Sequence, residues 1–219
     1  MKRGKLFYMT RAFVRLGLGP WRSEVEPPQG PTVYVCSHSN LRGPLTALAY
    51  LPFPTRPWVL HVFTDRETCR AQYRDYTFSV RFGLPKPLAS GLAWAASGYV
   101  SALMGSLGAV PVYRGTVKAG QTFKASAAAL RAGDSLLIFP DVDYTDSSQG
   151  IGEVYDGFLF LERFWRKQSA EPLRFVPLRL DRERKVITAG KPVRFDRNAD
   201  WKTELVRVRE ALREEINEA

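Results

Sequence analysis

His38 is one of only two histidines in this chain of 219 residues, and its position in the sequence suits chemistry. An apolar run over 32–36, rich in β-branched residues, stops at a polar cluster, and an apolar helical pattern over 44–50 follows. This pattern predicts a buried strand, a tight loop that carries His38, and a helix. Ligands gather at the carboxyl ends of strands in such sheets, and an imidazole there can act as a general base. The alternative is a structural histidine that is hydrogen-bonded to a neighbouring loop carbonyl.

Two further strand ends carry polar side chains. Arg114 follows one apolar run, and Asp141 and Asp143 follow the run 135–139. Because strand ends that are distant along the chain can converge in one cleft, we expect these side chains near His38. A base, a carboxylate pair and an arginine that binds anions would suit transfer onto a hydroxyl group. The alternative for the aspartates is a turn in which they accept backbone hydrogen bonds.

The order and spacing of these segments resemble the glycerolipid acyltransferase family, the 1-acylglycerol-3-phosphate acyltransferases (PlsC-like). His38–Leu45 is in frame with the family's H-x-x-x-x-D motif, which is usually followed by Pro-Leu. Gly108–Arg114 resembles its Gly-x-Ile-x-Val-x-Arg motif, and Phe139–Tyr144 resembles its F-P-E-G-T-R motif. The resemblance covers about residues 31–195, with three later family signatures matched at 156–158, 176–178 and 190–192.

The resemblance implies a glycerol-3-phosphate acyltransferase-like α/β fold, with a mixed central sheet flanked by helices. The family moves a fatty acyl group from acyl-CoA or acyl carrier protein, as co-substrate, to a hydroxyl of a lipid, without a metal, a cofactor or a covalent enzyme intermediate. His38 would take the proton of the acceptor hydroxyl (or amine), and Arg114 would hold the acceptor's phosphate. The other residues carried over as substrate contacts are Ser39, Asn40, Arg42, Tyr144 and Gly157.

The sequence departs from the family pattern at two positions. Gly43 stands where the motif has the Asp that orients and stabilises the charged histidine, and Val142-Asp143-Tyr144 replaces Gly-Thr-Arg. One explanation is a lipid-binding module that has lost catalysis, in which Gly43→Asp is expected to restore some acyl transfer. The other is persisting catalysis on a changed acceptor, with Asp141 or Asp143 as the partner of His38. Pro-Asp-Val-Asp-Tyr also resembles a motif of the lipid A late acyltransferases, which favours an acceptor without phosphate.

Hydrophobic periodicity predicts the elements that position these residues. Strands are expected at 32–36, 58–63, 109–113, 135–139, 174–180 and 185–188, and helices at 44–50, within 87–108, and at 116–131, 156–168 and 200–218. Strands that alternate with helices indicate an α/β domain. A proline-rich linker near residue 27 divides the chain into a basic amphipathic helix with its linker, 1–26, and an acyltransferase-like α/β domain, 27–219.

The first 22 residues could bind a membrane surface. Leu6, Met9 and Phe13 follow helical spacing among six basic side chains, while Arg11 and Arg15 interrupt the apolar core that a secretory signal needs. The helix could lie in the membrane interface, with its basic groups on lipid headgroups. Alternatively, it could pack one face on the domain.

Composition narrows the partners. The formal net charge is +10, from 32 Lys and Arg against 22 Asp and Glu, which favours an anionic membrane surface or a phosphorylated substrate. Nucleic acid is not expected, because no recognition motif accompanies the charge. The uncharged stretch 87–113 is too rich in Ser and Gly for a membrane span, and it predicts a chain that is peripheral on the cytoplasmic face of the cell membrane. Two cysteines allow no metal site and no disulfide framework, which indicates a reducing compartment, and Cys36 is expected to be a buried hydrophobe.

Overall fold

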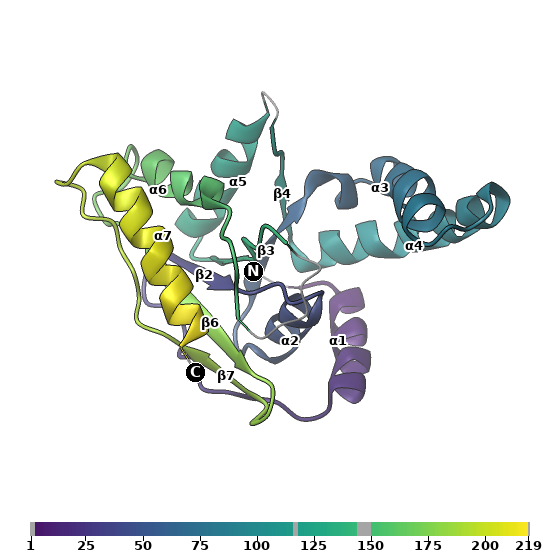
Figure 1. Cartoon of the computed structure of the whole chain (residues 1–219), viewed down its shortest axis with the longest axis horizontal. Helices are drawn as coiled ribbons and strands as arrows, with labels where there is room; N and C mark the ends of the chain where they lie inside the picture. Colours follow the sequence, from purple (N-terminus) through teal and green to yellow (C-terminus); the bar gives the residue numbers. More distant parts are fainter. Residues whose placement is uncertain (1–2, 116–117, 144–149, 219) are drawn as a thin grey trace. The chain divides into compact units, whose positions relative to one another are not determined.

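The computed structural model describes residues 3–115, 118–143 and 150–218. The chain forms two compact units, a smaller one of Met1–Thr10 and Pro57–Thr122 and a larger one of Arg11–Arg56 and Phe123–Ala219. Strands alternate with helices along the chain (Figure 1), so the predicted α/β class is confirmed. The boundary expected after residue 26 stays a prediction.

The larger unit contains a mixed sheet. Its strand order is β1-β7-β6-β2-β5, with β2 in parallel between β6 and β5, and with β6 and β7 antiparallel. The strands are β1 (Arg22–Ser23), β2 (Thr32–Cys36), β5 (Ser135–Ile138), β6 (Arg174–Asp181) and β7 (Val186–Ala189). The sequence predicted all of them except β1, whose two residues are too short for a periodic pattern.

Helices cover both faces of this sheet. Every residue of β2 is buried, and alternate residues point to opposite faces. Tyr34 and Cys36 form a core with α2 (Arg42–Tyr50) and with the second half of α1 (Lys5–Leu18), from which Val14 contributes. The strand thus ends inside a packed layer, and the loop that leaves it is firmly supported.

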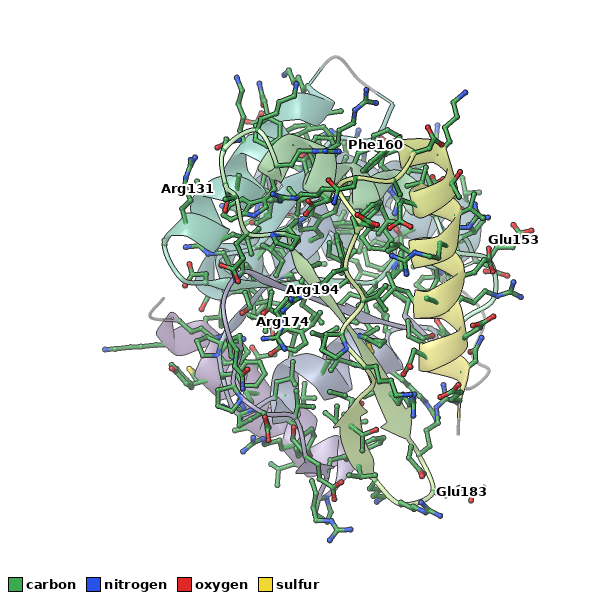
Figure 2. The ribbon with its side chains drawn as sticks, turned by 90° about the vertical axis from the view of Figure 1, so that its left-hand side faces the viewer. Arg131, Glu153, Phe160, Arg174, Glu183 and Arg194 are labelled. Atoms are coloured by element: carbon green, nitrogen blue, oxygen red, sulfur yellow. The ribbon has the colours of Figure 1, made fainter. Side chains whose placement is uncertain are left out.

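The opposite face carries η3 (Asp156–Leu159), α6 (Phe160–Trp165) and α7 (Trp201–Asn217). Phe175 of β6 packs edge to face on Phe158, with ring centroids 5.9 Å apart. As predicted, Asp200 caps α7, because its carboxylate accepts the Thr203 main-chain N–H at 3.0 Å. Figure 2 shows α7 along the sheet and Glu183 at the tip of the β6–β7 hairpin.

In the smaller unit, helices pack beside a parallel strand pair. β3 (Thr55–Leu60) pairs with β4 (Val110–Val112) from Trp58 onward. The helices are η1 (His61–Phe63), α3 (Arg66–Gln72), the π-helix η2 (Tyr73–Arg81) and α4 (Lys86–Leu107), while α5 (Ala119–Arg131) starts in this unit and ends in the larger one. Among the described residues, no helix is long and apolar enough to cross a membrane.

The prediction that the second strand reaches residue 63 is wrong. β3 ends at Leu60, and His61 begins a 3₁₀ turn that closes when the Thr64 amide donates to the His61 carbonyl at 3.0 Å. Asp65 then caps α3 and fixes the new chain direction. Apolar residues alone do not separate a strand from a short turn, which explains the error.

Glu204 of α7 contributes to stability in a pH-dependent way. Its buried carboxylate accepts hydrogen bonds from Arg207 Nε at 2.6 Å and from the Asp196 main-chain N–H at 2.7 Å. The Arg207 guanidinium lowers the pKa of Glu204 below its usual 4.5, although burial acts in the opposite direction, and the Asp196 amide assists. Because the pKa is lower in the folded chain than in the unfolded one, this stabilisation is present above about pH 4.5 and is lost as the pH falls through the folded value.

Arg207→Ala is therefore expected to lower the free energy of unfolding by about 1.5 kcal/mol at pH 7, and by less near pH 3.5. Urea unfolding at both pH values measures the difference. Arg213→Ala is the matched control, because Arg213 lies 3.6 Å from Glu210 in an exposed pair and should contribute less than about 0.5 kcal/mol. A loss for Arg207→Ala that is equal at both pH values would contradict the role of Glu204.

Candidate functional site

The loop between β2 and α2 has an unusual backbone. Ser39, Asn40 and Leu41 have φ angles of 42°, 48° and 71°, so three consecutive residues with side chains are left-handed. Each costs roughly 1 kcal/mol or more, and such residues persist only where the surroundings determine the conformation. The main-chain N–H groups of Arg42 and Gly43 close the loop through hydrogen bonds of 3.1 Å to loop carbonyls. Strain of this kind is typical of ligand-binding and catalytic loops.

Asp141 holds this loop from the neighbouring strand. Its side chain is only 8% exposed, and it accepts the His38 main-chain N–H at Oδ2 (2.8 Å) and the Ser37 hydroxyl at Oδ1 (3.1 Å). The contact arises because β2 and β5 are parallel neighbours, with Val35 opposite Ile138, so their carboxyl ends lie side by side. The structure thus brings two of the predicted site residues together, with the carboxylate bound to the backbone of His38.

The imidazole of His38 is half-buried and contacts a hydrogen-bond donor. Its Nδ1 accepts the main-chain N–H of Leu41 at 3.3 Å, and the ring meets Phe139 edge to face with centroids 5.9 Å apart. An Nδ1 that accepts a hydrogen bond places the proton of the neutral ring on Nε2. The arrangement differs from that of a histidine oriented by a carboxylate, in which Nδ1 carries the proton.

Gly43 is required by the packing of this loop. A Cβ at this position would overlap the carbonyl oxygen of Ser37 and would lie 2.9 Å from its carbon and 3.1 Å from the His38 oxygen. All three are backbone atoms, which cannot rotate away as the end of a side chain can. The first turn of α2 therefore approaches the end of β2 too closely for the aspartate of the family motif.

The second aspartate, Asp143, lies apart from this arrangement. It is exposed and follows an antiparallel bridge between Asp141 and Val154, which is extended by the Val142 N–H bond to the Glu153 carbonyl at 3.0 Å. The structure thus distinguishes the two aspartates, with Asp141 buried against the loop and Asp143 facing solvent. Tyr144, a predicted substrate contact, lies outside the described residues.

The remaining predicted site residues are spread over both units. Asn40 is exposed in the loop. Gly157 lies in η3, where a Cβ would overlap the Tyr155 ring. Arg114 is exposed in the turn after β4 and belongs to the smaller unit, so its convergence with His38 stays a prediction.

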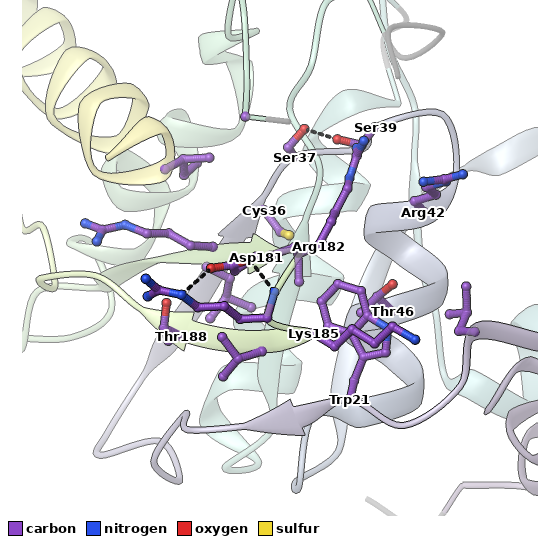
Figure 3. A pocket seen from close by; sticks show the side chains of 18 of the residues that line it. Trp21, Cys36, Ser37, Ser39, Arg42, Thr46, Asp181, Arg182, Lys185 and Thr188 are labelled. Atoms are coloured by element: carbon purple, nitrogen blue, oxygen red, sulfur yellow. Dashed lines mark hydrogen bonds and ion pairs between the residues drawn. The ribbon is translucent and has the colours of Figure 1, made fainter. Parts of the chain in front are cut away.

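A cavity of about 630 Å³ lies in the larger unit at the carboxyl edge of β2 and β6 (Figure 3). The buried hydroxyl residues Ser37 and Ser39 line it from the loop, together with the exposed Arg42 at the start of α2. Two of the predicted substrate contacts, Ser39 and Arg42, therefore face one cavity. His38 is not among the described residues that line it, although both of its neighbours are.

Sequence reasoning missed the far side of this cavity. Arg182 and Lys185 line it from the β6–β7 hairpin, and Trp21 lines it from the segment before β1. The signal available in the sequence was the charged run 181–185 between two predicted strands, which is also what an ordinary solvent-exposed turn looks like. Only the placement of β6 beside β2 brings that run to the His38 loop.

Cys36 fits the prediction of a buried hydrophobe. The residue is fully buried at the end of β2, and this burial, together with the negative charge of Asp141, raises the pKa of its thiol far above the usual range. The group is therefore a thiol at neutral pH, whereas a nucleophile requires the thiolate.

Asp141→Asn is expected to lower the free energy of unfolding by about 2 kcal/mol. An amide oxygen can still accept one hydrogen bond, but the amide NH₂ would face a second donor. Urea unfolding tests this, with Asp143→Asn as the matched control, because an exposed aspartate should change stability by less than about 0.5 kcal/mol. Equal losses in the two variants would show that the carboxylate of Asp141 does not hold the loop.

Comparison with known proteins adds no relative: neither the family models, nor the curated proteins, nor the solved structures that were searched contain a match. Among the described residues, no group of three or more His, Cys, Asp or Glu side chains could hold a metal ion.

Proposed function

We propose that this chain is an acyltransferase with a glycerol-3-phosphate acyltransferase-like fold. It would move a fatty acyl group from acyl-CoA or acyl carrier protein to a hydroxyl, or an amine, of a lipid-type acceptor. The observation that carries the proposal is the loop of His38: it lies at the carboxyl end of a central strand, is fixed by the buried Asp141, and has a cavity with apolar and cationic walls on its flank. The resemblance of six ordered motifs supports the same function.

His38 supplies the base in this proposal. The acceptor hydroxyl replaces the Leu41 amide at Nδ1 and transfers its proton there as its oxygen attacks the thioester carbonyl. The carbon–sulfur bond then breaks, and the departing thiolate takes the proton from the imidazolium, so an ester and a free thiol result. The exchange requires movement of only one exposed loop residue, since Leu41 is 58% exposed. Asp141 keeps the His38 backbone in place meanwhile.

A second candidate function is lipid binding without transfer. It is favoured by the contact that occupies Nδ1, because the Leu41 amide takes the place of a hydrogen-bond acceptor behind the ring. Gly43 leaves no room for the carboxylate that would reverse this polarity. On this alternative the cavity binds the same ligands, and no product forms.

The partner surface that we propose is an anionic membrane, on the inner face of the cell membrane. The sequence from 76 to 133 contains six basic residues and no Asp or Glu. In the smaller unit this segment carries exposed apolar side chains, among them Val80 at 68%, Phe82 at 59% and Trp94 at 58%. Exposed aromatic groups with basic neighbours suit the headgroup region of a bilayer.

The test is turnover by the purified full chain. Long-chain acyl-CoA or acyl carrier protein is offered with vesicles that contain lysophosphatidic acid, monoacylglycerol, a glycolipid or an amino lipid, and the products are identified by mass spectrometry. Product formation that depends on His38, but not on the other histidine, supports the proposal. Binding of the same lipids without product in any combination would overturn it in favour of the second candidate.

A further inference from the structure

The cavity beside the His38 loop has an excess of positive charge. Five basic and two acidic residues line it. Two of the basic ones are matched by carboxylates: Arg179 lies 2.7 Å from Glu215, and the exposed Arg184 lies 3.7 Å from Asp181. The unmatched positive charge is contributed by Arg42, Arg182 and Lys185.

These three cations come from two sides of the cavity. Within the described part of the chain, no carboxylate lies within ion-pair distance of Arg42 or Lys185. Figure 3 shows the Arg182 side chain extended from the β6–β7 hairpin toward Ser39 on the loop. An anion in the cavity would therefore meet guanidinium groups from both sides, the geometry that arginine uses for phosphate.

The hairpin that presents Arg182 and Lys185 is held by its own hydrogen bonds. The Asp181 carboxylate accepts the main-chain N–H of Arg184 at 2.8 Å, and the Lys185 carbonyl accepts the Arg22 N–H at 2.9 Å from β1. Lys185 adopts a left-handed φ of 51° in this turn. A fixed turn loses less conformational entropy when it binds a ligand, which favours a built anion site over a loose surface charge.

The rest of the lining is apolar. Leu18, Trp21, Leu180 and Val186 are among the lining residues, and Trp21 packs on Tyr50 with ring centroids 6.4 Å apart. A simple inorganic anion would leave this wall in contact with water, and a plain hydrocarbon would bury cations without compensation. A ligand that satisfies both parts has a phosphate at one end and an apolar or extended chain at the other.

We infer that this cavity binds the phosphate of an amphiphilic substrate, through Arg42, Arg182 and Lys185. The inference rests on the proposed function and names the substrate class of the same site, either a phosphorylated lipid acceptor or the phosphopantetheine arm of the acyl donor. It also revises the expectation from the third motif, because the hairpin supplies cations in place of the arginine missing there.

Binding to the full-length protein, measured by calorimetry without turnover, tests this. Two pairs of probes are compared: lysophosphatidic acid with monoacylglycerol, each below its critical micelle concentration, and phosphopantetheine with pantetheine. In at least one pair we expect the phosphorylated member to bind about tenfold more tightly, or better. Preference in the lipid pair identifies the acceptor, and preference in the pantetheine pair identifies the donor. The absence of preference in both pairs overturns the inference.

Arg182→Gln and Arg42→Gln are expected to remove that preference while leaving the unphosphorylated probes unaffected. Arg213→Gln on α7 is the matched control, because it removes the same charge from an exposed pair that does not line the cavity. If Arg213→Gln weakens binding as much as Arg182→Gln, the effect is general electrostatics and the inference fails. Phosphate-dependent binding that persists in His38→Ala, in a chain without detectable turnover, would sustain this inference while the proposed function fails.

Discussion

His38→Ala is expected to lower kcat for acyl transfer by about 10³-fold with the fold intact. The substitution removes the only imidazole of the loop, while the contact that secures the loop is made by the main-chain N–H of residue 38 to Asp141 and survives. What is lost structurally is the Leu41 N–H contact and the edge of Phe139, worth about 1 kcal/mol together. A large change in rate with a small change in stability separates a chemical role from a structural one.

The matched control is His61→Gln. His61 is the second histidine of the chain, belongs to the smaller unit, and contacts the Val112 carbonyl through Nδ1 at 3.2 Å. Glutamine keeps a hydrogen-bonding side chain there, so kcat should change by less than about twofold. Initial rates over a range of donor concentrations separate kcat from KM. Equal kcat values for the wild type and His38→Ala would exclude His38 as the base.

Local patterns account for what could be predicted from the sequence. The strand before His38 and the strand before Asp141 are short apolar runs that end in polar residues, and parallel neighbours place their ends together. The Asp200 cap is a one-residue signal beside a periodic helix. These features depend on a few adjacent residues, so they can be read without the fold.

The details of the site depend on contacts that are distant in sequence. Ser39, Asn40 and Leu41 include no glycine, and nothing local indicates three left-handed residues. Their conformation is imposed by the buried Asp141, about a hundred residues further along the chain. The cationic wall from Arg182 likewise follows from the position of β6 in the sheet. Sequence reasoning found the loop and the strand ends, but it could not foresee that the loop closes around a glycine.

That glycine gives the second large expected effect: Gly43→Asp should destabilise the chain by about 3 kcal/mol or more and should not increase acyl transfer. The new Cβ would overlap the Ser37 carbonyl, so the first turn of α2 must move away from β2. That movement breaks the bond from the Gly43 N–H to the His38 carbonyl and disturbs the backbone that Asp141 holds. The expectation from the motif alone, a gain of activity, is reversed by the packing.

Two further variants separate the causes. Gly43→Ala carries the same Cβ without a charge and should lose nearly as much stability as Gly43→Asp, because the overlap begins at that atom. Gly120→Asp places the same side chain in α5, where nothing lies within 4 Å of a Cβ, and should change the free energy of unfolding by less than about 0.5 kcal/mol. Urea unfolding and initial rates are measured for all three. If Gly43→Asp instead folds with wild-type stability and gains transfer, the loop can open to admit the carboxylate, and His38 then works with an acid directly behind its ring.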